Sequence, residues 1–267
     1  MFCIEYARVF TVGFTMCYQK NVITKKEIID GLRHQYFVNH YQPIYNVESE
    51  SLSGVEVLLR FNSPLLGSVS PYFFIELAEK ENLINDLFFF SANQAMKDLN
   101  NNHKLKKISI NISPTTLNIP NLYRWLRDKC KEYFLSNECV TLEITENVEY
   151  VETKTSCENI KNLKLLGFGL SIDDFGTGYS SLSRLKAIPF DELKIDKMFI
   201  ENVTTSYSDQ IIIEHLVCLT KSMGLQVVAE GIEDLETYNI LKEIGVDLCQ
   251  GYFFHKPMDI NKLVNKV

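Results

Sequence analysis

The segment from Asp173 to Ser181, with the sequence DDFGTGYSS, is the densest group of potentially reactive side chains in the chain. Two adjacent carboxylates at the end of a strand can contact two metal ions, and the glycines permit a tight loop with unusual backbone angles. An Asp-rich turn with two glycines is also common as a simple loop and helix cap. Taken alone, the segment is therefore compatible with either a metal site or a structural turn.

A polar residue also recurs in, or just after, each successive apolar segment. These residues are Glu56, Asn111, Glu143, Asp173, Lys194, Glu230 and Gln250. If their carboxylates met in one pocket, they would repel one another strongly unless divalent cations neutralised them. Carboxylates and an Asn carbonyl, without Cys or His, are hard oxygen ligands that favour Mg²⁺ or Mn²⁺.

Structural roles are the alternative for individual members of this set. Glu56 could form a buried ion pair without any metal, because a lone Glu in an apolar strand needs a partner. Lys194 could form an ordinary salt bridge with Asp196. The five histidines show no ligand spacing and are interpreted as structural or exposed residues.

The apolar segments that must position these residues alternate between strand and helix patterns. The predicted strands span 36–45, 52–61, 106–112, 140–145, 169–173, 192–195, 226–229 and 246–249, and the predicted helices span 25–34, 73–81, 86–100, 123–133, 153–166, 208–223 and 235–244. This alternation predicts an α/β fold of parallel βα units, closed as a single (β/α)₈ TIM-like barrel. In such a barrel the C-terminal strand ends converge on one mouth, which is where we expect the active site.

Composition limits the partners and the compartment. The formal net charge of -7 argues against a nucleic-acid polymer or an anionic membrane surface as a partner. No apolar run reaches the roughly 18 residues that a membrane-spanning helix needs. The seven cysteines are odd in number and scattered, which favours reduced thiols in the cytoplasm.

The domain limits follow from the same patterns. Residues 1–22 are interpreted as an N-terminal extension, with Met1 and Met16 as alternative starts, and residues 23–267 as one domain. A short apolar stretch at 9–17 could be a signal segment, but Glu5 precedes it and no clear cleavage site follows.

From about Ile23 to its end, the sequence resembles the EAL-domain cyclic di-GMP phosphodiesterases. The resemblance rests on Tyr41-Gln42-Pro43-Ile44, Gly54-Val55-Glu56-Val57-Leu58-Leu59-Arg60, Ser70-Pro71 with Phe74-Ile75 and Ala78-Glu79, Asn111-Ile112-Ser113, Glu143-Ile144-Thr145-Glu146, Asp173 to Ser181, Lys194-Ile195-Asp196, Ala229-Glu230-Gly231-Ile232-Glu233 and Gln250-Gly251-Tyr252. Val57 replaces the Ala of the signature and Phe61 replaces the usual Trp. Neither departure removes a metal ligand.

The resemblance implies roles for individual residues. One Mg²⁺ or Mn²⁺ ion would be held by Glu56, Asn111, Glu143 and Asp173, and a second by Asp173, Asp174 and Glu230. Lys194 resembles the catalytic lysine, and Glu230 and Glu56 are further catalytic candidates, with the general base left open. Gln42, Arg60 and Gln250 resemble substrate contacts. Glu146 would anchor the Asp-rich loop and Glu233 would support the lysine, although either could be an ordinary surface acid.

Two functions follow from this resemblance. The first is metal-dependent hydrolysis of cyclic di-GMP to linear pGpG. The alternative is a catalytically silent cyclic di-GMP receptor or protein-interaction module. The resemblance also implies a homodimer formed through the helix around 180–187. A nucleic-acid-binding regulator has no basic face or recognition motif to support it.

Overall fold

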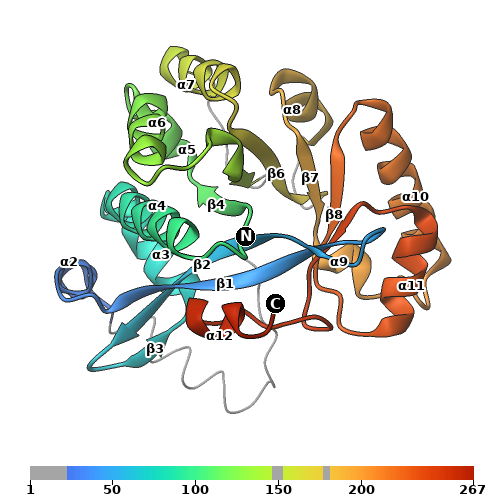
Figure 1. Cartoon of the computed structure of the whole chain (residues 1–267), viewed down its shortest axis with the longest axis horizontal. Helices are drawn as coiled ribbons and strands as arrows, with labels where there is room; N and C mark the ends of the chain where they lie inside the picture. Colours follow the sequence, from blue (N-terminus) through green and yellow to red (C-terminus); the bar gives the residue numbers. More distant parts are fainter. Residues whose placement is uncertain (1–22, 146–152, 177–180) are drawn as a thin grey trace.

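The computed structural model describes residues 23–145, 153–176 and 181–267. Within these residues, eight strands close into a barrel, in the order β1, β2, β4, β5, β6, β7, β8, β9 and back to β1 (Figure 1). Their bounds are β1 (Phe37–Asn46), β2 (Leu52–Ser63), β4 (Ile108–Ile112), β5 (Val140–Thr145), β6 (Gly169–Phe175), β7 (Glu192–Ile195), β8 (Gln226–Ala229) and β9 (Leu248–Cys249). A further short strand, β3 (Gly67–Val69), pairs with β2 outside the barrel. The predicted α/β barrel is confirmed.

Strand β1 departs from the parallel arrangement of the other barrel strands, a direction that the sequence patterns did not predict. It runs antiparallel to both of its neighbours, β2 and β9, whereas β2 and β4 to β9 are parallel. The physical reason is the short connection from β1 to β2, because parallel strands need a crossover of a dozen or more residues. On its outer side, the Tyr41 hydroxyl donates to Asp98 Oδ2 at 2.6 Å and ties β1 to a helix.

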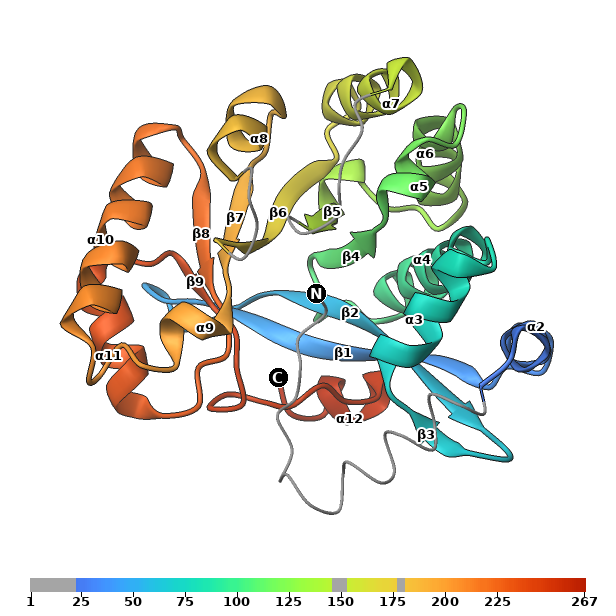
Figure 2. The same ribbon diagram turned by 180° about the vertical axis from the view of Figure 1, so that it is seen from behind.

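Helices surround the barrel on the outside (Figure 2). They are α2 (Lys25–Arg33), α3 (Pro71–Lys80), α4 (Ile84–Asn101), α5 (Pro114–Leu117), α6 (Leu122–Glu132), α7 (Lys154–Leu165), α8 (Ser181–Ala187), α9 (Lys197–Ile200), α10 (Tyr207–Ser222), α11 (Leu235–Ile244) and α12 (Ile260–Val264), with a 3₁₀ turn at Asn137–Cys139. Side-chain caps fix several of their first turns. For example, Asp234 accepts a hydrogen bond from the Thr237 N–H at the start of α11.

Two negative observations on the described residues complete the fold. No helix among them is long and apolar enough to cross a membrane. All five cysteines among the described residues are free thiols.

Alternation along each strand separates the core from the barrel interior. Leu142 and Ile144 of β5 are fully buried in the main apolar core, where they pack with residues of the surrounding helices. Glu143 lies between them in sequence and therefore points to the opposite face, into the barrel. The same alternation applies to β6, where Asp173 follows the buried Ile172. Apolar side chains therefore lie on the outer faces of these strands, and polar side chains point into the barrel.

The loops that follow β8 and β9 touch each other through their backbones. The Ile232 N–H donates to the Gln250 carbonyl at 3.2 Å, and the Phe253 N–H donates to the Ile232 carbonyl at 2.9 Å. A Cβ atom on Gly251 would lie 2.0 Å from the Ile232 carbonyl oxygen, so only glycine fits there.

We expect Gly251→Ala to lower the free energy of unfolding by about 2 kcal/mol or more, because rigid backbone blocks the new methyl group. Gly224→Ala is the control. Gly224 has a positive φ but no neighbouring atom in the way, so this change should cost only about 1 kcal/mol of backbone strain. Urea denaturation followed by circular dichroism measures both variants. Equal losses would contradict the proposed backbone contact.

Candidate functional site

Side chains from every strand of the barrel meet in its interior. Glu56 comes from β2, Asn111 from β4, Glu143 from β5, Asp173 and Asp174 from β6, Lys194 from β7 and Gln42 from β1, while Glu230 and Gln250 directly follow β8 and β9. Asn111 is half-buried and the others are buried. The parallel strands deliver their residues from their C-terminal ends, as barrel geometry requires.

Lys194 lies at the centre of this cluster and is fully buried. Its Nζ lies 2.7 Å from Glu230 Oε1, 3.1 Å from Glu143 Oε1, 3.2 Å from Asp173 Oδ1 and 3.5 Å from Glu56 Oε2. Burial alone would lower the pKa of Lys194, but the surrounding carboxylates outweigh it and hold the pKa well above its ordinary value. Lys194 is therefore a fixed positive charge. Asp196, the alternative partner, is not among these four carboxylates; it accepts a hydrogen bond from the Met198 N–H and caps α9.

The single ammonium group does not balance the carboxylates around it. Carboxylate oxygens of Asp173, Asp174 and Glu230 all lie within 4.8 Å of one another. Burial, with the nearby Asp173 charge, raises the pKa of Asp174 to about 8. Burial also raises the pKa of Glu143 and of Glu230 well above the ordinary value, although Lys194 acts in the opposite direction. The cluster resists full ionisation unless further positive charge enters it.

Several oxygens of the cluster have no hydrogen-bond donor. Among the described residues, nothing donates a hydrogen bond to Glu143 Oε2 or to Asn111 Oδ1, and Glu143 Oε1 and Asp173 Oδ1 have only their ion-pair contacts with Lys194 Nζ; all four atoms are buried. A buried acceptor left without a donor costs about 1–3 kcal/mol. These oxygens fit a hard divalent cation such as Mg²⁺ or Mn²⁺, for which carboxylate and amide oxygens are the usual ligands.

Amide side chains orient Glu56 at one side of the cluster. Gln250 Nε2 donates to Glu56 Oε2 at 2.5 Å and to Gln42 Oε1 at 3.1 Å. Asn111 Nδ2 donates to Glu56 Oε1 at 3.3 Å, which leaves Asn111 Oδ1 as its possible ligand atom. Gln42 Nε2 in turn donates to the His255 carbonyl at 3.2 Å. The structure thus places Gln42 and Gln250 together, beside Glu56.

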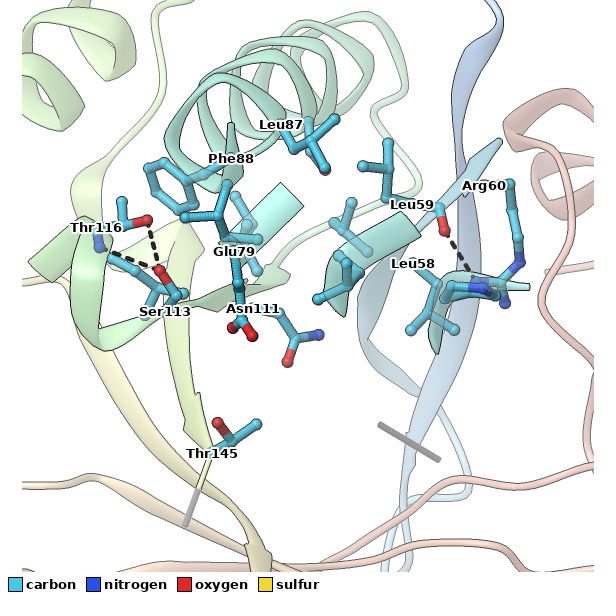
Figure 3. A pocket seen from close by; sticks show the side chains of 17 residues that line it. Leu58, Leu59, Arg60, Glu79, Leu87, Phe88, Asn111, Ser113, Thr116 and Thr145 are labelled. Atoms are coloured by element: carbon cyan, nitrogen blue, oxygen red, sulfur yellow. Dashed lines mark hydrogen bonds between the residues drawn. The ribbon is translucent and has the colours of Figure 1, made fainter. Parts of the chain in front are cut away.

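A small cavity of about 100 Å³ adjoins the cluster (Figure 3). Its walls are mainly apolar and include Leu58, Leu87 and Phe88. Asn111, Arg60 and Glu79 also line it, and Asn111 makes the connection to the carboxylates. Arg60 was predicted to be a substrate contact, whereas Glu79 was assigned no role, although the Ala78-Glu79 match was a signal.

Three sequence-based expectations fall elsewhere. Glu146 and Ser180 lie outside the described residues. Glu233 lies on the exposed side of the loop after β8, where its Oε1 is 2.5 Å from Lys197 Nζ. The lysine in ion-pair contact with Glu233 is therefore Lys197, a residue that sequence analysis did not single out.

Comparison with known proteins agrees with this geometry. The family model described as the EAL domain matches residues 25–257. The cyclic di-GMP phosphodiesterase RocR of Pseudomonas aeruginosa is 33% identical over 235 residues, which cover 87% of this chain and 60% of RocR. The cyclic di-GMP phosphodiesterase NbdA of the same organism is 32% identical over 243 residues, which cover 90% of this chain and 31% of NbdA. The chain therefore spans only part of the length of these two relatives.

Solved structures share both the fold and the sequence pattern. The PaMucR phosphodiesterase in complex with c-di-GMP has a TM-score of 0.82 at 32% identity, covering 89% of this chain and 98% of that structure. An EAL domain protein from Listeria monocytogenes EGD-e has a TM-score of 0.81 at 33% identity, covering 92% and 98%. With the family model spanning most of its length and the buried acidic cluster in place, this chain belongs to the EAL domain family of cyclic di-GMP phosphodiesterases.

Proposed function

We propose that the chain hydrolyses cyclic di-GMP to linear pGpG with two divalent metal ions, Mg²⁺ or Mn²⁺. The observation that carries this proposal is the buried carboxylate cluster with oxygens that lack hydrogen-bond donors. Relatives about one third identical, such as RocR, are phosphodiesterases for this nucleotide.

The residues divide into two sets of ligands. Glu56, Asn111, Glu143 and Asp173 would hold one ion, and Asp173, Asp174 and Glu230 the other. Glu143 Oε2 and Asn111 Oδ1, which accept no hydrogen bond, support the first set, and the close approach of the three carboxylates supports the second. When bound, the ions supply a water of lowered pKa and polarise the phosphodiester.

Side chains of the protein would stabilise developing charge and accept the proton of the attacking water. The Lys194 ammonium offsets the negative charge that develops on the phosphate oxygens, and its raised pKa keeps it protonated. Glu230, 2.7 Å from that ammonium, is a candidate to accept the proton of the attacking water, as is Glu56. Gln250 fixes the orientation of the Glu56 carboxylate through its hydrogen bond, and Gln42 accepts a hydrogen bond from the same Gln250 amide.

The cavity beside Asn111 supports the choice of a nucleotide as substrate. Its apolar walls suit the faces of a purine base, and the Glu79 carboxylate can accept the N–H groups on the edge of a guanine. Arg60, four residues after Glu56 on β2, can donate two parallel hydrogen bonds to a phosphate.

The central test is to incubate the purified chain with cyclic di-GMP and Mg²⁺ or Mn²⁺ and to identify products by chromatography. Linear pGpG is expected, chelation should abolish it, and restored metal should return it. Binding of cyclic di-GMP without any product would instead establish the silent receptor.

Glu143→Gln should lower turnover by at least about 100-fold, because it removes a charged ligand and not merely a neighbour of one. Glu192→Gln is the matched control. Glu192 is an equally buried glutamate of the barrel, but it lies two residues before Lys194 on β7 and pairs with Lys107 at 3.6 Å. Its turnover should stay near that of the unaltered chain. Similar losses in both variants would refute the assignment of Glu143.

Stability of the ion-free chain should depend on pH. Burial raises the pKa of Asp174 to about 8, and that of Glu143 and Glu230 also rises, whereas these groups ionise near pH 4 in the unfolded chain. Between about pH 4 and 8 the native state therefore holds protons that the unfolded chain has lost, so stability falls as pH rises. Mg²⁺ replaces those protons.

The gain in Tm on adding Mg²⁺ should accordingly be larger at pH 8 than at pH 6. Thermal unfolding with and without Mg²⁺ at both pH values measures it, and Glu143→Gln should show a smaller gain. A gain that is equal or larger at pH 6 would be inconsistent with metal binding to these groups.

We also infer a homodimer formed through α8. Leu182 of this helix is an apolar side chain that is 63% exposed, so it is available for such a contact. Leu182→Glu should shift the chain toward the monomer in light scattering, whereas Leu165→Glu, at a 74% exposed leucine of α7, should not. A strictly monomeric unaltered chain would rule the dimer out.

A further inference from the structure

Asp173, Asp174 and Glu230 come from strand ends that are not adjacent. Asp173 and Asp174 lie near the end of β6 and Glu230 directly follows β8, and β7 lies between these two strands in the sheet. No ladder of hydrogen bonds joins β6 directly to β8. The distances among the three carboxylates therefore depend on the element that lies between the two strand ends. Inside the barrel that element is Lys194 of β7. At the strand ends it is α9, the four-residue helix that follows β7 after Asp196 (Figure 2).

One side chain of α9 packs on Gly176, which directly follows the end of β6 that carries the two aspartates. A Cβ atom on Gly176 would lie 2.5 Å from Cε2 and 2.8 Å from Cζ of Phe199. Gly176 has a φ of +100° and Asp174, two residues earlier, has a φ of +54°. The backbone of this turn is therefore held in left-handed conformations, and the Phe199 ring lies directly against it.

A second side chain of α9 packs on the loop that carries Glu230. A Cβ atom on Gly231 would lie 2.6 Å from Cβ and 2.5 Å from Cγ of Lys197. The contact is with the base of the lysine side chain, which cannot swing away without moving the helix. The Lys197 ammonium then reaches Glu233 of the same loop, with Nζ 2.5 Å from Oε1.

We propose that Phe199 and Lys197 are positioning residues, through which α9 sets the spacing of Asp173 and Asp174 relative to Glu230. The inference rests on the proposed metal-dependent function, because the spacing matters most when one ion is shared across it. The neighbouring Met198 serves as the comparison, because its side chain is 50% exposed and is not among the atoms that a Cβ on Gly176 or Gly231 would meet first. Both glycines are needed because any side chain would push α9 off the loops.

The two parts of the Lys197 contact should differ in importance. An ion pair between partly exposed groups is worth little, whereas packing of the stem against Gly231 fixes the backbone next to Glu230. Lys197→Met keeps most of the stem and removes the charge. Lys197→Ala removes both, so it should be the more damaging change.

The test is the affinity for Mn²⁺ alone, measured by isothermal titration calorimetry on the full chain at a pH where the chain is folded. Phe199→Ala and Lys197→Ala should each weaken binding about 10-fold or more, the usual cost of losing support behind a ligand. Lys197→Met should weaken it less, and Met198→Ala should leave it unchanged. Turnover of the weakened variants should recover at high Mn²⁺. In the double variant Phe199→Ala/Lys197→Ala, the two losses of Mn²⁺ affinity should not add. Either change alone already allows the distance between the aspartates and Glu230 to vary.

Thermal unfolding of each variant without metal separates positioning from simple loss of fold. Variants that remain folded and bind Mn²⁺ as tightly as the unaltered chain would overturn the role of α9 and leave the proposed function intact. An unaltered chain that binds no Mn²⁺ would refute the proposed function, and with it the role of α9. If Phe199→Ala does not fold, Phe199→Leu and Lys197→Ala carry the test.

Discussion

Electrostatic repulsion among buried carboxylates is the constraint on which the rest of this structure depends. Among the described residues, five such groups lie close together at the C-terminal strand ends, around the ammonium group of Lys194. In a region with little water, each unbalanced charge is unfavourable in free energy. The pKa of Asp174 is raised for this reason. The arrangement is therefore destabilising unless further positive charge enters it, which is consistent with a metal site.

Apolar burial on the outside of the barrel offsets the destabilising effect of the acidic cluster. Apolar residues on the outer faces of the strands, such as Leu142 and Leu170, are fully buried against the helices. Their burial is favourable in free energy and independent of the polar interior, since alternate residues of a strand face opposite sides. A sheet with covered outer faces can hold an acidic centre that no small apolar core would tolerate.

Contacts among the loops convert this scaffold into a defined site. Gly251 allows the loops after β8 and β9 to touch through their backbones, which brings Gln250 beside Glu56. Charge attraction gathers the carboxylates around Lys194, but attraction alone does not set distances. Fixed distances require rigid backbone, and close glycine contacts of this kind provide it at the C-terminal strand ends.

By itself, the sequence determined the identity of the strands and of the polar residues that they carry. The predicted limits of β5, β7, β8 and α11 coincide with those of the structure, because hydrophobic periodicity is a local property. The family resemblance and the one-polar-residue-per-strand pattern likewise selected the residues that meet in the interior. The antiparallel direction of β1 was missed, although the short link between β1 and β2 carried the signal.

Only the tertiary structure decided which of those groups touch. The contacts of Lys194 with four carboxylates join residues from five different parts of the chain. The pairing of Glu233 with Lys197, the placement of Gln42 beside Gln250 and the cavity next to Asn111 depend in the same way on how the barrel closes. Spacing along one strand says which face a residue occupies, whereas distances between strands are set by the stagger and closure of the whole sheet.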